Sequence, residues 1–235
     1  MSLSHSPKII TDGLVLYLDA SNLKSYPGSG NTWNDLSGNE NTGTLTNGPV
    51  YNSSNPRYIS FDGTDDYVIA NNTSLNSKFS STSVSHSTWI YPVSAGQIVS
   101  ELGQSSINTA WHTSNIEISS AGAFSFSTWH SGLGNKVVSS NQSFNQWYHL
   151  VFSYNGTTLT AYINGESIGT ATFTIQAPYN NGYQTHYALC AIDSTNMGTS
   201  GYAGARISSF SVYNRSLTSI EVKQNFNAVR GRYGI

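Results

Sequence analysis

The chain has 235 residues, a net charge of −2 at pH 7 and only 9% charged residues, whereas aromatic residues reach 12%. This aromatic content excludes an intrinsically disordered chain, and the absence of a basic run excludes an electrostatic surface for nucleic acid. No apolar run approaches the ~20 residues of a membrane-spanning helix, so membrane insertion is excluded as well.

The first half of the chain predicts short strands and long loops. Residues 1–12 are predicted to form an N-terminal arm, and residues 13–235 a single domain, because all-β units of this size are common. The apolar run 13–20 predicts a strand. Dense glycine and proline over 21–49 favour a long surface loop, pinned by Trp33 and Leu36, with a short strand near 42–45. Residues 58–61 predict a strand, 62–66 a turn and 67–70 the return strand.

The middle of the chain shows alternating polar and apolar residues. In the run 84–91, Val84, His86, Thr88 and Ile90 occupy one face, and Pro92 is expected to end the strand. Further short strands are predicted over 97–102, 116–119, 123–130 and 136–139. Turn signals at intervals of about 8–12 residues favour an antiparallel sandwich over alternating strands and helices.

Residues 147–165, WYHLVFSYNGTTLTAYING, predict two strands, with a third near 167–173. Trp147, His149, Val151 and Ser153 would share one face of the first strand. Asn155-Gly156 and Asn164-Gly165 are both suited to type I′ hairpin turns, which need positive φ at two residues. The segments 187–192 and 203–213 are expected to be closing strands.

One helix is predicted, over residues 219–227. Thr218 and Glu221 have the spacing of a capping box, in which each side chain binds the backbone N–H of the other residue. Leu217 and Val222 occupy the two positions of a hydrophobic staple, and Val222 and Phe226 are expected to pack against the sheet.

Four blocks of the sequence resemble laminin-G-like, concanavalin A-like jelly rolls of the type found in bacteriophage structural proteins. The Trp-x-His run with its Asn-Gly turns is one, and the others are GLVLYLDASNLKSYPGSGNTWNDLSGNENTGTLTNGP, YISFDGTDDYV and ISSFSVYNRSLTSIEVKQNFNAVRGRYG. The resemblance implies an all-β fold, an antiparallel two-sheet β-sandwich of the concanavalin A jelly-roll type, with a short C-terminal helix.

The same resemblance implies a role on a virion. Phage relatives occur in fibres, tail-associated proteins and capsid decorations, and they are mostly binding or structural modules. The expected location is the virion surface, released by lysis, which fits opening residues that lack the features of a signal peptide. The expected partners are host or environmental polysaccharide, other virion proteins and further copies of the chain as a homo-oligomer. A purely structural subunit-contact protein with no glycan ligand is the alternative.

A glycan hydrolase is the less favoured alternative. It needs two carboxylates about 5–5.5 Å apart if retaining, but Glu101 and Glu117 stand alone in their segments. No histidine pairs with a cysteine or another histidine at metal spacing, and His149 is expected to pack within the sandwich. The chain is therefore predicted not to be an enzyme. Cys190, the only cysteine, lies in the apolar ALCAI segment and is predicted to be a buried, inert side chain.

No cofactor is required for a core of this size, but calcium is a candidate ligand. Asp62, Asp65 and Asp66 offer oxygen ligands in one turn, and Asp19 is a further candidate. The alternative is an ordinary turn whose aspartates bind the local backbone. Many relatives carry Ile-Asp-Glu before the closing aromatic strand, and Ile207-Ser208-Ser209 replaces it here.

Sugar binding requires an aromatic face with polar groups beside it. Three segments that we expect to form loops provide this combination, and their candidate contacts are Trp111, His112 and Asn115; Trp129 and His130; and Tyr179 and Tyr183. The alternative for each is packing or loop anchoring. Trp33, Trp89 and Trp147 are instead assigned to the core or to structural anchors.

Overall fold

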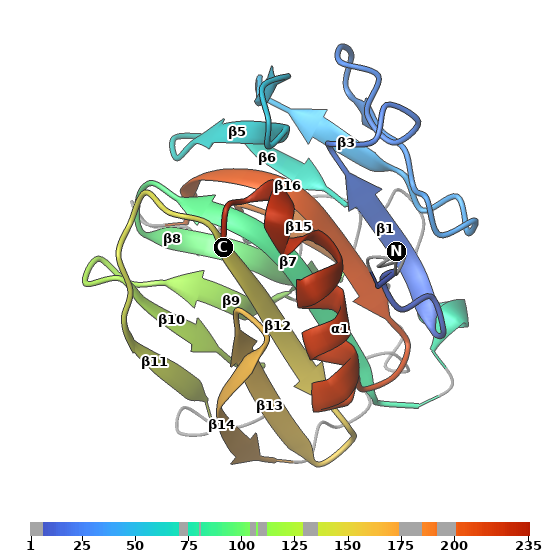
Figure 1. The fold of residues 1–235 in the computed structure, drawn as a ribbon, viewed down its shortest axis with the longest axis vertical. Helices are drawn as coiled ribbons and strands as arrows, with labels where there is room; N and C mark the ends of the chain where they lie inside the picture. The colour runs from blue at the N-terminus through green and yellow to red at the C-terminus, as the bar shows by residue number, and fades with distance from the viewer. Residues whose placement is uncertain are drawn as a thin grey trace, which may run out of the picture.

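The computed structural model describes residues 7–70, 75–79, 81–103, 107, 112–128, 136–173, 185–191 and 201–235. Two antiparallel sheets of eight strands each pack face to face, with helix α1 on the outer side of one of them (Figure 1). The predicted fold class, an antiparallel two-sheet β-sandwich with a short C-terminal helix, is confirmed.

The first sheet, called sheet A, lies beneath the helix. Its order is β14 (Glu166–Thr172), β13 (Thr158–Ile163), β12 (Tyr148–Tyr154), β7 (Val84–Pro92), β16 (Gly204–Tyr213), β5 (Tyr58–Asp62) and β4 (Val50–Asn52), and β1 (Leu14–Asp19) also pairs with β16.

The second sheet is called sheet B. Its order is β11 (Val137–Asn141), β10 (Ala123–Phe126), β9 (His112–Ile118), β8 (Gly96–Leu102), β15 (His186–Leu189), β6 (Tyr67–Ile69), β3 (Gly43–Thr46) and β2 (Thr32–Trp33). The helical elements are η1 (Asn76–Lys78), α1 (Ser219–Val229) and η4 (Arg230–Arg232).

The core lies between the sheets, and strand alternation selects its members. Phe152 of β12 and Phe210 of β16 are buried there, and Trp33 is fully buried as well. His86 of β7 also points into this space, where its Nε2 lies 3.0 Å from the Tyr187 hydroxyl. Cys190 is buried and free, as predicted.

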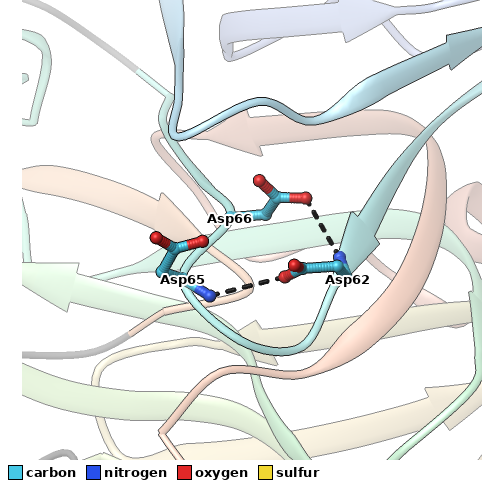
Figure 2. Close-up of side chains that lie close together, drawn as sticks. All are labelled: Asp62, Asp65 and Asp66. Atoms are coloured by element: carbon cyan, nitrogen blue, oxygen red, sulfur yellow. Dashed lines mark hydrogen bonds between the residues drawn. The ribbon is translucent and has the colours of Figure 1, made fainter.

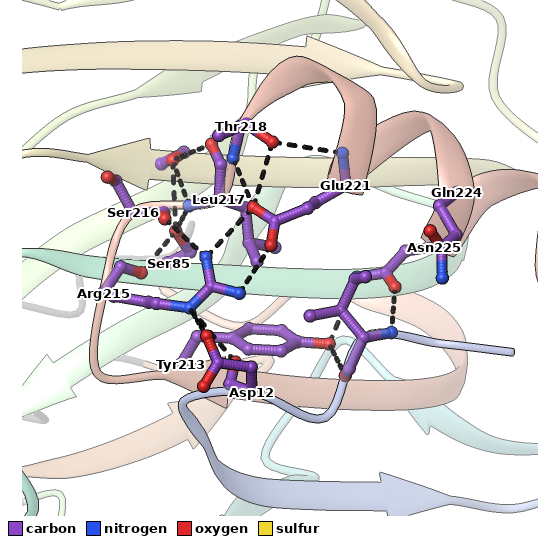
Figure 3. A network of polar contacts seen from close by, with 12 residues as sticks. Asp12, Ser85, Tyr213, Arg215, Ser216, Leu217, Thr218, Glu221, Gln224 and Asn225 are labelled. Atoms are coloured by element: carbon purple, nitrogen blue, oxygen red, sulfur yellow. Dashed lines mark hydrogen bonds and ion pairs between the residues drawn. The ribbon is translucent and has the colours of Figure 1, made fainter.

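Helix α1 is anchored to sheet A by polar contacts at its start (Figure 3). Thr218 accepts from the Glu221 amide and the Glu221 carboxylate accepts from the Thr218 amide, so the predicted capping box is present. Arg215 donates two hydrogen bonds to Glu221, which lower the pKa of that carboxyl to about 2. The hydroxyls of Ser85 and Ser153 both accept from the backbone N–H of Leu217.

The N-terminal arm also contacts the helix. The Ile10 amide donates to the Asn225 side chain, and the Gln224 side chain donates to the Lys8 carbonyl. Within the described segments, no helix is long and apolar enough to cross a membrane.

Of the two predicted type I′ turns, one is confirmed and the other is wrong. Asn164 and Gly165 have φ values of 53° and 80°, as a type I′ turn requires, but at Asn155-Gly156 only Gly156 has positive φ. There the Asn155 carboxamide accepts from the Thr157 and Thr158 amides, so its side chain shapes the turn instead.

The strands on either side of the acidic turn do not form the predicted hairpin. β5 pairs with β16 in sheet A, whereas β6 pairs with β3 and β15 in sheet B. The chain crosses from one sheet to the other at Asp62–Asp66. Alternation marks which face of each strand is buried, but it does not identify the partner strand.

His149 lies outside the sandwich interior, contrary to the prediction. It is 1% exposed because α1 covers it, and its ring stacks on Trp89 at 5.0 Å. Its Nε2 lies 2.8 Å from the Ser87 hydroxyl. Burial lowers the pKa of His149 to about 3, so the ring is neutral beneath the helix.

Candidate functional site

The acidic turn brings three of the four predicted calcium ligands together. One ligand oxygen from each of Asp62, Asp65 and Asp66 lies within 4.8 Å of the others. The Asp62 carboxylate accepts from the Thr64 amide at 2.7 Å. The Asp62 amide donates to the Asp66 carboxylate at 3.1 Å (Figure 2). These hydrogen bonds therefore stabilise the turn, which also brings the three carboxylates close together.

The negative charges in this turn repel one another. Backbone hydrogen bonds, first from Thr64, lower the pKa of Asp62. Burial raises the pKa of Asp66, and the negative charges of Asp62 and Asp65 raise it further. A cation would relieve this repulsion, and carboxylate oxygens are the ligands that calcium prefers. The three carboxylates are ligands of the kind that calcium binds, and they also make the backbone hydrogen bonds of an ordinary aspartate turn.

Asp19 lies apart from this turn. Asp19 pairs with Ser209 and Asp62 with Gly204, so about five residues of β16, or ~17 Å, separate them. The Asp19 carboxylate instead binds Arg232 at 2.9 Å and accepts from the Tyr17 hydroxyl at 3.0 Å.

The serine that replaces the relatives' acid is engaged by other groups. The Ser208 hydroxyl donates to the Arg57 carbonyl at 2.7 Å and accepts from the Tyr233 hydroxyl at 2.9 Å. At this position the protein's own hydrogen bonds use the only side-chain oxygen.

A groove lined by both polar and apolar side chains crosses the outer face of sheet B, and the sequence did not reveal it. Its volume is about 460 Å³, and it spans β8, β9, β10 and the start of β11. Gln97, Glu117, Ser125 and Lys136 contribute polar side chains to it. The Gln97 amide donates to the Glu117 carboxylate at 3.0 Å and accepts from the Ser114 hydroxyl.

Strand register explains how these side chains meet. Glu117 of β9 pairs with Gln97 of β8 on one side and with Ser125 of β10 on the other. Residues paired across neighbouring strands point to the same face, so the three side chains form one row. We call the groove with this row the sheet B groove.

Most of the predicted sugar contacts lie outside the described residues: Trp111, Trp129, His130, Tyr179 and Tyr183. The other two belong to β9, not to a loop as expected. His112 is half-buried and pairs with Leu102, whereas Asn115 is only 2% exposed. The polar run HTSN extends β9 because pairing with β8 satisfies its backbone, although its composition resembles that of a loop.

Residues 62–223 match the family model described as the concanavalin A-like lectin/glucanases superfamily, a span that covers more than half of the chain. The chain belongs to this superfamily. The laminin-G-like, concanavalin A-like resemblance is thereby confirmed over residues 62–223. Among curated proteins, none shows a significant sequence match.

Solved structures share the fold of this superfamily member at low sequence identity. A mutant of Trypanosoma rangeli sialidase that displays trans-sialidase activity has a TM-score of 0.69 at 14% identity, over 97% of this chain and 34% of that chain. The same sialidase in complex with sialic acid has a TM-score of 0.68 at 13% identity, over 97% and 36%. The binding domain of botulinum neurotoxin serotype D/C has a TM-score of 0.68 at 18% identity, over 93% and 53%.

These likenesses concern the fold alone. The chain spans about a third of the length of the sialidase chains and about half of the neurotoxin binding domain. The neighbours include both enzymes and a binding domain, so they do not decide between catalysis and binding in this lectin/glucanase-type domain.

The two strand carboxylates of sheet B do not form a hydrolase pair. Glu117 faces the outer groove, whereas Glu101 is 2% exposed and pairs with Tyr187, whose hydroxyl lies against His86 in the interior. Their positions differ by about four residues along β8, or ~13 Å. A glycosidase needs its two carboxyl groups about 5–9.5 Å apart and on the same face.

Proposed function

We propose that this superfamily member is a non-enzymatic carbohydrate-binding module carried on a bacteriophage virion. The observation that carries the proposal is the sheet B groove. Its volume, about 460 Å³, falls in the range of ligand pockets, roughly 300–1,000 Å³. An amide, a carboxylate, a hydroxyl and an ammonium group line it, and these donors and acceptors suit the hydroxyl groups of a sugar.

One polar side chain of the groove is held in place before any ligand binds. Gln97 is fixed between Ser114 and Glu117, so its carboxamide loses little freedom on binding. Ordering side chains in advance reduces the entropic cost of association. Glu117, the one carboxylate among the described residues that line the groove, serves as a hydrogen-bond acceptor in this proposal and not as half of a catalytic pair.

Two of the predicted aromatic contacts are close in the sequence to strands that line the groove. β8 ends at Leu102 and β9 begins at His112, while β10 ends at Phe126 and β11 begins at Val137. These four strand ends lie at one end of the sheet because neighbouring strands are antiparallel. Gln97 and Glu117 each lie five residues from these ends of β8 and β9, so Trp111, which precedes β9, and Trp129, which follows β10, are proposed as sugar contacts from the sequence alone.

The virion setting rests on the sequence blocks that resemble phage structural proteins. In this setting the ligand is host or environmental polysaccharide, and the partners are other virion proteins and further copies of the chain. A subunit-contact role without a glycan would need an interface of more than about 1,000 Å² in total.

A glycan array with purified protein tests the binding half of the proposal. Wild type is expected to bind a restricted set of glycans, and Gln97→Ala and Trp111→Ala are expected to weaken binding at least tenfold. Lys24→Gln, an exposed change in a loop, is the control and should bind as wild type does. Absence of binding by a folded wild-type protein would reject glycan recognition and favour the subunit-contact alternative.

Mass spectrometry of purified phage particles tests the virion half. Peptides of the protein are expected in the particle fraction at a constant ratio to the capsid protein. Their absence from particles, with the protein present in the lysate, would reject this location.

A further inference from the structure

A second group of planar side chains lies on the outer face of sheet A, on the opposite side of the molecule from the sheet B groove. Arg206 of β16 pairs with Tyr91 of β7, and Trp147, directly before β12, packs its ring 5.6 Å from that of Tyr91. Tyr58 of β5 completes the group, with its ring 5.9 Å from Trp147. We call these four residues the aromatic platform.

Within the platform, the guanidinium group of Arg206 lies between two aromatic rings. The Arg206 guanidinium carbon lies 4.4 Å from the centre of the Tyr91 ring and 5.1 Å from that of Tyr58. Both distances are within the ~6 Å range of cation–π attraction. All four side chains are half-buried, so they are held by packing and still reach solvent.

Arg206 has no carboxylate partner within the described part of the chain. The ion pairs there join Arg215 to Asp12 and Glu221, Lys223 to Glu166, and Arg232 to Asp19. No side-chain hydrogen bond of Arg206 occurs among the described residues either. The guanidinium therefore offers a positive charge and a planar fork of N–H donors to a ligand.

The shape and charge together select the ligand class. Aromatic faces stack against the C–H groups of a sugar ring, whereas a guanidinium fork matches a carboxylate with two parallel hydrogen bonds. A neutral sugar would use the rings but not the charge. A protein partner would need about 800 Å² of surface on this side, far more than four half-buried side chains supply.

We propose that the aromatic platform binds an acidic sugar residue, a pyranose that carries a carboxylate, within an anionic polysaccharide. The sugar ring stacks on Trp147, because the Tyr91 ring stands at 63° to it and already faces the guanidinium, and the carboxylate pairs with Arg206. This site is independent of the sheet B groove, because the two lie on the outer faces of different sheets.

Isothermal titration with oligogalacturonate, a chain of carboxylate-bearing sugars, tests the proposal. Wild type should bind it, and Arg206→Gln should weaken binding at least tenfold. Arg206→Lys should fall between them, because lysine keeps the charge but loses the planar fork. Lys24→Gln, which removes one exposed positive charge from a loop, should bind as wild type does. Trp147→Phe, which keeps an aromatic ring, should weaken binding less than Trp147→Ala.

The methyl ester of the same oligosaccharide is the matched ligand control. Esterification removes the charge and keeps the sugar ring, so the ester should bind wild type and Arg206→Gln equally weakly. Thermal unfolding of each variant confirms that it is folded. Equal binding of acid and ester by wild type, unchanged binding by folded Arg206→Gln, or no binding by wild type would overturn the proposal.

Gln97→Ala separates this proposal from the proposed function. It should leave oligogalacturonate binding unchanged while it reduces glycan binding in the sheet B groove. Loss of oligogalacturonate binding in Gln97→Ala, with Arg206→Gln unaffected, would place the acidic sugar in the groove and reject the platform.

Discussion

The carboxyl group of Glu101 should make the stability of the protein fall as the pH rises from 4.5 to about 8. Its side chain is buried between Tyr187 and Thr113 in the neighbouring strands, and its Oε1 has no hydrogen-bond partner among the described residues. Burial raises the pKa of Glu101 to about 8, against a smaller opposing effect of the hydrogen bond with Thr185. Glu101 is thus largely protonated in the folded protein at pH 7.

The magnitude follows from the difference in pKa between the folded and unfolded states. The unfolded chain releases this proton near pH 4.5 and the folded protein near pH 8, so unfolding is increasingly favoured between these values. Each pKa unit is worth about 1.4 kcal/mol, so the loss in the free energy of unfolding is about 3 kcal/mol by pH 7 and about 5 kcal/mol by pH 9.

Glu101→Gln tests this reasoning, because the amide has nearly the shape of the protonated acid and cannot ionise. Urea denaturation at pH 5, 7 and 9, followed by tryptophan fluorescence, gives the free energy of unfolding. Between pH 5 and pH 9 this free energy should rise for the variant, relative to wild type, by about 4 kcal/mol. Glu117→Gln, the same change on the outer face of β9, should follow the wild-type profile. Parallel profiles for wild type and Glu101→Gln would refute an uncharged Glu101 in the core.

Three further predictions concern the helix, a buried histidine and the acidic turn. Thr218→Ala should lower the free energy of unfolding by about 1 kcal/mol relative to the control Ser219→Ala in urea denaturation, and equal stabilities would contradict the cap. Because the pKa of His149 is about 3, stability should fall as pH drops from 6.5 toward 3, and His149→Gln should make that decline shallower by about 1.4 kcal/mol per pH unit. An unchanged slope would mean that His149 is not buried neutral. Millimolar calcium should raise the Tm of wild type but not of Asp65→Asn, and equal rises would place the ion elsewhere.

The elements that sequence predicted best depend on local contacts. Thr218 and Glu221 are three residues apart, so the geometry of one helical turn is enough to bring their capping groups together. The hairpin at Asn164-Gly165 is equally local, because both residues adopt the positive φ that its turn requires. Such features need no knowledge of the partner sheet, so pattern and propensity suffice to place them.

The sheet B groove could not be predicted in this way. Gln97, Glu117, Ser125 and Lys136 come from separate segments, and alternation shows only that each side chain can point outward. Whether they meet depends on the order of the strands and on register, which tertiary packing sets. β15 illustrates the difficulty, because it inserts between β8 and β6 from more than 80 residues further along the chain.

The outer face of sheet A shows a further limit, because alternation does not reveal what covers a face. Trp89, Tyr91, Trp147 and His149 all lie on this face, but Trp89 and His149 are buried beneath Phe226 of α1, while Tyr91 and Trp147 reach solvent. The chain that follows β16 decides the difference. The 11 residues of α1 span about 16 Å, whereas the ten residues of β16 span about 33 Å. Helix α1 begins near Ser85 and reaches as far as Trp89, and Tyr233 beyond it stacks on Trp89 at 3.9 Å. The aromatic platform borders this covered part, because the Tyr233 ring also lies 4.9 Å from that of Trp147.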